Sequence, residues 1–157
     1  MRGAKRGPRK CGVKTLARMR RHFSSMALGR RGERLIAKKL RAAGLEVHSV
    51  ASQKLPYDLL VAGKIRVECK AARLKRCHRQ NDKRLRARWS IGIARGKRLN
   101  EECDWYVILL TGCDDMHNVY LIVKSPLRRR TLRITLRLLL TKYREDIDRF
   151  DRIAVAA

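Results

Sequence analysis

Residues 56–72, with the sequence PYDLLVAGKIRVECKAA, constrain the fold of this chain more than any other segment. Two apolar runs flank the pair Ala62-Gly63, and this spacing predicts two antiparallel strands joined by a tight hairpin turn. Two acids interrupt the runs, because Asp58 begins the first strand and Glu68 lies inside the second. The hairpin is therefore expected to bring Asp58 opposite residues close to Glu68.

The second strand also carries Lys70, two positions after Glu68. Because side chains alternate along a strand, Arg66, Glu68 and Lys70 are expected to point to one face. Two carboxylates and a backbone carbonyl form a hard-oxygen site that suits Mg²⁺, and a neighbouring lysine can orient or help deprotonate a metal-bound water. The alternative is a solvated strand face with a same-side ion pair, which is the usual meaning of Glu-x-Lys on a strand.

The segments around the hairpin predict further helices and strands. Residues 24–44 form a helical pattern that Ser24 or Ser25 can cap and Gly44 can end. Its buried side is expected to carry Leu28, Leu35, Ile36, Leu40 and Ala43. Residues 45–51 alternate as a short strand.

Beyond the hairpin, residues 73–98 are expected to be loop at their centre, with a short strand at 88–94. The continuous apolar run 104–112 is typical of a central strand buried on both faces, and 118–124 is its expected hairpin partner. Residues 131–138 fit an edge strand or a helix, and 141–155 fit a closing helix with Thr141 as its cap. The order of elements predicts an α/β fold with a mixed central sheet and flanking helices.

The charge balance points to a polyanionic partner. The chain has 40 Lys and Arg against 14 Asp and Glu, a net charge of +26, and residues 64–98 alone hold fourteen cations against two acids. Neutralising phosphates releases counterions, so nucleic acid is the expected partner. A membrane is the weaker alternative, because the chain has no apolar run of roughly 18–20 residues and no amphipathic helix beyond core needs.

Other motifs narrow the classes of function. Five cysteines, an odd number without a C-x-x-C pair, favour free thiols in a reducing cytoplasm over a disulfide scaffold, and no signal peptide is visible. The adjacent pair Cys77-His78 lacks the second pair that a zinc site needs. The absence of a Gly-rich phosphate loop argues against a nucleotide cofactor.

Residues 29–72, GRRGERLIAKKLRAAGLEVHSVASQKLPYDLLVAGKIRVECKAA, resemble the core of the PD-(D/E)XK nuclease superfamily, whose fold is restriction-endonuclease-like. Within it, the segment is most similar to archaeal-type Holliday-junction resolvases and related phage- or intron-encoded endonucleases. The family pattern maps onto Glu33, Asp58, Glu68 and Lys70.

The resemblance implies roles for these residues. Asp58, Glu68 and the backbone carbonyl of Cys69 would bind one or two Mg²⁺ or Mn²⁺ ions. Lys70 would position the attacking water, and Glu33 would complete the metal site directly or through water. The implied activity is that of a Mg²⁺-dependent endodeoxyribonuclease, acting as a homodimer on branched or duplex DNA and leaving a 5′-phosphate.

Three parts of the chain follow from this reading: a basic arm at 1–26, expected to be mobile, a nuclease core at 27–125, and a basic strand-and-helix extension packed on the core at 126–157. DNA contacts are expected from Ser52, Arg66, Arg73, Lys75, Arg76, Arg79, Arg30 and Arg31. A Holliday junction is the preferred substrate, with a site-specific duplex, as for a homing or restriction-type endonuclease, as the alternative. A non-catalytic, basic nucleic-acid-binding protein is the alternative of a different class.

Overall fold

The computed structural model describes residues 12–50, 55–79, 82–93, 102–112, 118–127 and 130–157. Within the helix and strands, its description of side chains leaves out residues 12–24, 76–79 and 82–86.

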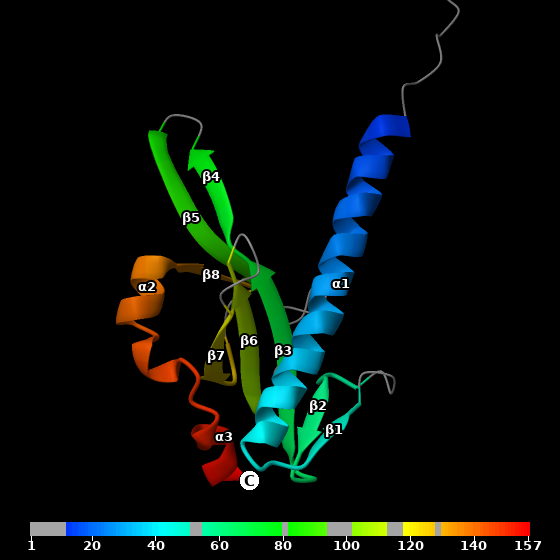
Figure 1. Ribbon diagram of the computed structural model, residues 1–157, viewed down its shortest axis with the longest axis vertical. Helices are drawn as coiled ribbons and strands as arrows, with labels where there is room; N and C mark the ends of the chain where they lie inside the picture. Colours follow the sequence, from blue (N-terminus) through cyan, green and yellow to red (C-terminus); the bar gives the residue numbers. More distant parts are fainter. Residues whose placement is uncertain (1–11, 51–54, 80–81, 94–101, 113–117, 128–129) are drawn as a thin grey trace, which may run out of the picture.

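The centre of the fold is a five-stranded mixed sheet with the strand order β1-β2-β3-β6-β7 (Figure 1). Its strands are β1 (Val47–Ser49), β2 (Leu59–Val61), β3 (Ile65–Arg73), β6 (Trp105–Thr111) and β7 (Asn118–Lys124). The pair β3 and β6 is parallel, and all other neighbours in this sheet are antiparallel. The expected α/β fold with a mixed central sheet and flanking helices is confirmed.

Helix α1 (Gly12–Ala42) packs along one face of this sheet (Figure 1). The helix begins at Gly12, so the expected start at Ser24 or Ser25 is wrong. The buried residues of its described part include Ile36 and Leu40, as expected, but Ala43 is exposed. Gly44 ends the helix with a φ of 81°, and the amide of Leu45 donates to the Leu40 carbonyl at 3.2 Å, as in a Schellman motif.

A second sheet of three strands covers the opposite face of the central sheet, with the order β4-β5-β8. Its strands are β4 (Lys75–Arg79), β5 (Asp82–Gly92) and β8 (Thr131–Thr135). The expectation of loop at the centre of residues 73–98 is therefore wrong. The end of β5 and β8 are held to the central sheet by a shared apolar cluster. Its members include Trp89 and Ile91 of β5, Ile134 of β8, and Ile108 and Leu110 of β6.

The C-terminal segment is not the single closing helix that the sequence predicts. It consists of α2 (Leu136–Thr141), the 3-10 helix η2 (Arg144–Asp146) and α3 (Asp151–Ala156). Residues 147 and 148 break the helix because they pair with the edge of β7: Ile147 bridges Leu121, and the Asp148 amide donates to the Tyr120 carbonyl at 2.7 Å. Thr135, rather than Thr141, caps a helix, since its hydroxyl accepts from the Leu138 amide at 3.2 Å.

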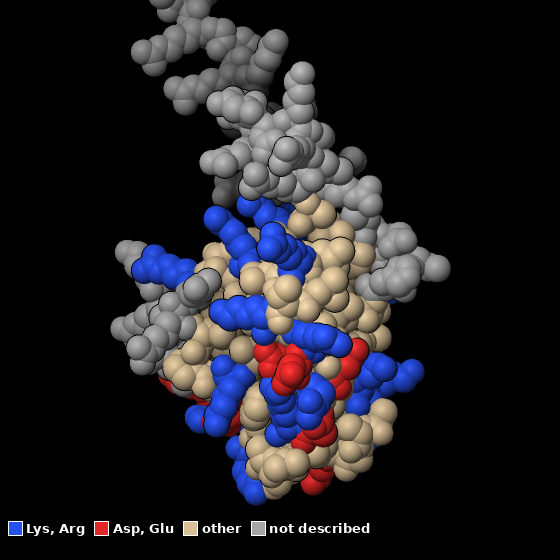
Figure 2. All heavy atoms as spheres, turned by 90° about the vertical axis from the view of Figure 1, so that its left-hand side faces the viewer, with Lys and Arg blue, Asp and Glu red and all other residues tan. Residues whose placement is uncertain are grey.

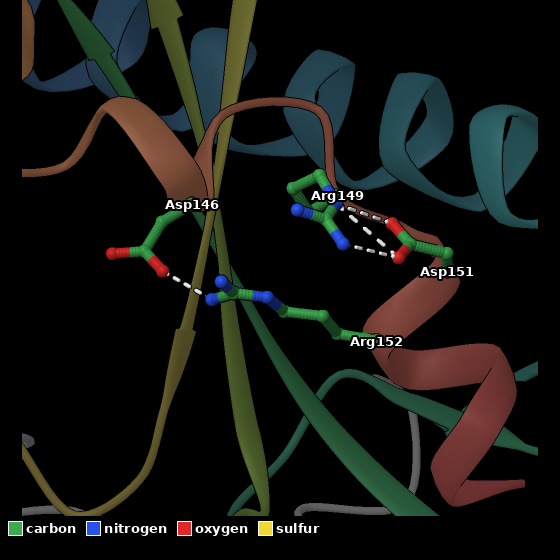
Figure 3. Close-up of polar contacts among 4 residues, drawn as sticks. All are labelled: Asp146, Arg149, Asp151 and Arg152. Carbon is green, nitrogen blue, oxygen red and sulfur yellow. Dashed lines mark hydrogen bonds and ion pairs between the residues drawn. The ribbon is translucent and has the colours of Figure 1, made fainter.

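Two ion pairs hold the end of this segment (Figure 3). Arg149 donates to both carboxylate oxygens of Asp151, at 2.7 to 3.2 Å, and Arg152 pairs with Asp146 of η2. The exposed Arg149–Asp151 pair contributes little stability, because water screens it. The anchor of α3 is Ile153, which is fully buried in the core beneath α1. In the part of the chain that the structure describes, no helix has the length and apolar character needed to cross a membrane.

Candidate active site

The β2–β3 hairpin sets the geometry of the site. Ala62 and Gly63 have φ values of 48° and 68°, and the Lys64 amide donates to the Val61 carbonyl at 3.2 Å. Two successive residues with positive φ are typical of a type I′ turn, which matches the twist of paired strands. The register pairs Leu59 with Val67. Asp58, one position before β2, therefore lies beside the part of β3 that contains Glu68.

Asp58 is tied to β3 through both its backbone and its side chain. Its amide donates to the Val67 carbonyl at 3.0 Å, and its carboxylate oxygen Oδ2 accepts from the Cys69 amide at 2.8 Å. The carboxylate thus accepts a hydrogen bond from β3 at the position where the backbone pairing of β2 with β3 ends. The amide and carbonyl of one strand residue point to the same edge, so the Cys69 carbonyl faces this edge as well.

Glu68 and Lys70, which lie two positions apart on β3 and on either side of Cys69, form a largely buried ion pair. The Glu68 side chain is 0% exposed and the Lys70 side chain 23% exposed, and Lys70 Nζ donates to Glu68 Oε1. A buried carboxylate is costly unless a charge or hydrogen-bond donor compensates it, and Lys70 supplies both. Glu68 lies opposite Tyr106 of β6 and Lys70 opposite Ile108. Both side chains therefore point away from α1, on the face that packs against the second sheet.

Glu33 reaches this region from α1 because the helix passes unusually close to β3. A Cβ atom at Gly32 would lie 2.7 Å from the Cβ of Ala71, so only glycine fits at this contact. Glu33 is half-buried, and this burial raises its pKa, with the charges of Asp58 and Glu68 raising it further. Lys70 and Arg30 act in the opposite direction and lower it.

The four groups, three carboxylates and one ammonium, lie within electrostatic range of one another around Glu33, and Arg30 adds a further positive charge there. Their acids are the local exception in a protein whose net charge is +26. The buried Cys69 thiol is not a ligand candidate at neutral pH, because burial raises its pKa well above 9.0 and keeps it protonated. What Cys69 offers at this edge is its backbone carbonyl.

The described residues do not assemble a metal cage from side chains alone. Among the described residues, no group of three or more His, Cys, Asp and Glu side chains lies close enough together to hold a metal ion. Mg²⁺ keeps several waters and is commonly held by one or two carboxylates, which is what Asp58 and Glu68 provide. Glu33 does not join Asp58 and Glu68 in a group of three ligands.

The residues expected to contact DNA fall into three groups. Arg30, Arg31, Arg73 and Lys75 are exposed. Arg66 is engaged within the fold, since its guanidinium donates to both oxygens of Asp104 at 2.9 and 3.1 Å. Ser52 and the side chains of Arg76 and Arg79 lie outside the described residues.

Asp104 is a residue of this region to which the sequence analysis assigns no role. Its carboxylate also accepts from the Arg66 amide at 2.8 Å, and its own amide donates to the Arg66 carbonyl at 2.8 Å. These contacts lock the start of β6 to β3 two residues before Glu68, and the Arg66 guanidinium lowers the pKa of the Asp104 carboxyl. The sequence feature that could have indicated this role is the position of an acid directly before the apolar run 105–111.

Comparisons with known proteins give one similar structure. No protein-family model matches the chain, and no curated protein matches it. A bacterial homing endonuclease, I-Ssp6803I, has a similar structure, with a TM-score of 0.47 and 11% sequence identity over 69% of this chain and 72% of that chain. This level of similarity transfers no residue role and no substrate to this chain.

Proposed function

We propose that this chain is a divalent-metal-dependent DNA endonuclease that hydrolyses phosphodiester bonds at the cluster of Asp58, Glu68, Lys70 and Glu33. The observation that carries the proposal is the meeting of Asp58 with β3: its carboxylate accepts from the Cys69 amide, immediately beside the buried Glu68–Lys70 pair. A solvated strand face would not bury a carboxylate completely and place two more acids within its electrostatic range. Such an arrangement costs stability, and a bound cation relieves that cost.

In this proposal, each residue has a distinct task. Asp58, Glu68 and the Cys69 carbonyl would hold Mg²⁺ or Mn²⁺, with Glu33 contributing through water. The bound ion would lower the pKa of a water and stabilise negative charge on the phosphate oxygens. Lys70 would donate a hydrogen bond that orients the attacking water. The water oxygen would bond to phosphorus as the bond from phosphorus to the 3′ oxygen breaks. The water would release a proton to solvent and the 3′ oxygen would take one up from solvent, so the products would be a 5′-phosphate and a 3′-hydroxyl.

The proposed substrate is DNA, and the charge of the protein supports this choice. A net charge of +26 attracts a phosphate backbone over long range and speeds association. A four-way junction is the first candidate, because selecting it by shape needs only an extended basic surface. A specific site in linear duplex is the second, and a homodimer would supply two active sites for two strands.

The test is incubation of the protein with labelled four-way junction and linear duplex DNA, in Mg²⁺ and in EDTA. We expect cleavage in Mg²⁺ only, and its loss in Glu68→Gln and Asp58→Asn. Glu145→Gln, which changes an exposed acid on η2, is the matched control and should cleave normally. Tight binding without metal-dependent cleavage would instead identify a non-catalytic binding protein, and cleavage at one sequence of the linear duplex would identify a site-specific enzyme.

A further inference from the structure

The outer face of the second sheet presents cations in a regular array. Trp89, Ile91, Leu132 and Ile134 of this sheet are buried toward the central sheet. Side chains alternate along strands, so the residues between them face outward. The described residues of this outer face are all exposed: Lys75, Arg88, Ser90, Gly92, Thr131, Arg133 and Thr135. We refer to these seven residues as the outer face.

The register of the strands places the positive charges close together. Lys75 of β4 lies directly opposite Arg88 of β5, and Arg133 of β8 lies opposite Ser90, diagonal to Arg88. Directly opposite residues are about 5 Å apart and diagonal ones about 7–8 Å apart, and like charges at such spacing repel. The outer face holds no acid, and among the described residues none of Lys75, Arg88 and Arg133 forms an ion pair. This repulsion disfavours the sheet unless an anion lies over it.

The described acids on this side of the molecule do not extend to its upper part (Figure 2). Figure 2 shows the side of the molecule on which α2 and β5 lie. On it, Lys and Arg side chains are spread from top to bottom, whereas the described Asp and Glu side chains lie only in its middle and lower part, interspersed with cations. The acids of the C-terminal segment, such as Asp146 and Asp151, are paired with Arg152 and Arg149 and do not neutralise the sheet (Figure 3).

We infer that the outer face of the β4-β5-β8 sheet is a binding surface for the phosphate backbone of duplex DNA, with Arg88 and Arg133 as its principal contacts. Arg guanidinium groups and the Ser and Thr hydroxyls beside them are the side chains that contact phosphate oxygens. The outer face carries no aromatic residue among its seven members. Single strands are held by stacking on aromatic rings, so this surface favours a duplex.

The surface is connected to the candidate active site through the backbone. Only Leu74 separates β3 from β4, so Lys75 lies five residues beyond Lys70 on an almost continuous extended segment. At about 3.3 Å per residue, the two lysines are roughly 17 Å apart along the chain. This inference goes beyond the proposed hydrolysis, because it concerns binding that needs neither metal nor the carboxylates.

The test measures binding of the full chain to a fluorescent 24-base-pair duplex by anisotropy, in EDTA, between 50 and 200 mM salt. We expect Arg88→Gln/Arg133→Gln to weaken binding at least about tenfold at 0.1 M salt. The slope of log K against log salt should fall by about 2, since each phosphate contact contributes about 0.9. Lys142→Gln/Arg144→Gln removes two exposed cations from the C-terminal segment and should leave the slope within about 0.5 of the wild-type value.

Circular dichroism and thermal unfolding would establish that both double variants are folded. An equal slope change in the two double variants would overturn the inference, because it would show a diffuse charge effect. The same titration with single-stranded DNA and with duplex RNA tests the assignment to duplex DNA. If Arg88→Gln/Arg133→Gln weakened binding only to one of these two probes, the assignment would be overturned. Because the measurement is made without metal, it is independent of the cleavage test: failure of cleavage in Mg²⁺ would leave this result unchanged.

Discussion

The carboxylate of Asp58 accepts a hydrogen bond from the backbone amide of Cys69 at 2.8 Å, across the end of the β2–β3 hairpin. This contact gives Asp58 a role in the stability of the hairpin in addition to its role in the proposed chemistry. The acid that closes the hairpin ladder is the same acid that the proposed metal site requires. The two roles have different needs, since the ladder needs an acceptor and the metal needs a charge.

Substitutions at Asp58 are therefore expected to separate stability from activity. Asp58→Asn keeps an oxygen acceptor for the Cys69 amide and should lose less than about 1 kcal/mol of unfolding free energy, whereas Asp58→Ala should lose about 1.5–3 kcal/mol. Both variants should lose metal-dependent cleavage. Urea unfolding of the two variants beside Glu145→Gln measures the difference, and an equal loss in Asn and Ala variants would contradict the role of the hydrogen bond.

The contact between α1 and β3 predicts an unusual response to Gly→Ala substitution. At Gly32 a new methyl would lie 2.7 Å from Cβ of Ala71, and Gly32→Ala is expected to destabilise the protein by about 1–3 kcal/mol through overpacking. A Cβ atom added at Gly29 would have no packing neighbour within 4 Å. Gly29→Ala should therefore stabilise the same helix by about 0.5–1 kcal/mol.

A double-mutant cycle isolates the clash at Gly32. Ala71→Gly removes the opposing methyl, so Gly32→Ala/Ala71→Gly should recover stability relative to the sum of the single variants, with a coupling of about 1 kcal/mol or more. Chemical denaturation of the four proteins measures this coupling. Additive single effects would show that α1 shifts freely away from β3, and the placement of Glu33 would then not depend on Gly32.

The sequence predicted the central part of the fold well because its signals are local. The turn at Ala62-Gly63, the alternation on β3 and the apolar run of β6 each determine an element within a few residues. The position of Asp58 beside Cys69, between Glu68 and Lys70 of β3, follows from the hairpin register. These are the features in which backbone hydrogen bonding and burial agree.

The errors arose where a tertiary contact overrides a local pattern. Strand β4 and the first part of β5 were expected as loop because cations dominate their sequence, whereas the short strand expected at 88–94 coincides with the end of β5. Trp89 and Ile91 of this end are buried against the central sheet. The closing helix is interrupted because the backbone at Ile147 and Asp148 pairs with the edge of β7. The role of Asp104 depends on the parallel pairing of β3 with β6, which joins segments 38 positions apart.

The environment of Glu33 predicts a specific dependence of stability on pH. Its pKa is raised above the ordinary value of 4.5, so the folded state binds the proton more tightly than the unfolded state. Stability must then fall as pH rises from the unfolded pKa through the higher folded pKa. Glu33→Gln is expected to be more stable than the wild type at pH 7, and the advantage should shrink as the pH falls toward 4.

Urea unfolding of both proteins at pH 4, 5, 6 and 7 would measure this difference, without metal. Glu145→Gln, which changes an exposed acid on η2, is the control and should show no such trend. An advantage of Glu33→Gln that grows toward acid pH would mean that the ionised carboxylate stabilises the fold, and the interpretation of the cluster as a site of excess negative charge would be wrong.

The Glu68–Lys70 pair predicts the largest loss of stability. Lys70→Met removes the ammonium that pairs with the buried Glu68 carboxylate and should cost about 3–5 kcal/mol, whereas Lys124→Met at an exposed position should stay within about 0.5 kcal/mol of the wild type. Glu68→Gln/Lys70→Met removes both charges and should be more stable than Lys70→Met. Unfolding in guanidinium chloride measures these differences.

Mg²⁺ should rescue Lys70→Met in part, because a divalent ion beside Glu68 replaces the missing positive charge. The expected result is a rise in melting temperature of several degrees at millimolar Mg²⁺, since about 1 kcal/mol corresponds to roughly 2–4 °C for a chain of this size. The rise should be larger in Lys70→Met than in the wild type and absent in Glu68→Gln/Lys70→Met. An equal effect of Mg²⁺ on all three proteins would show that the ion binds elsewhere and does not reach the Glu68 carboxylate.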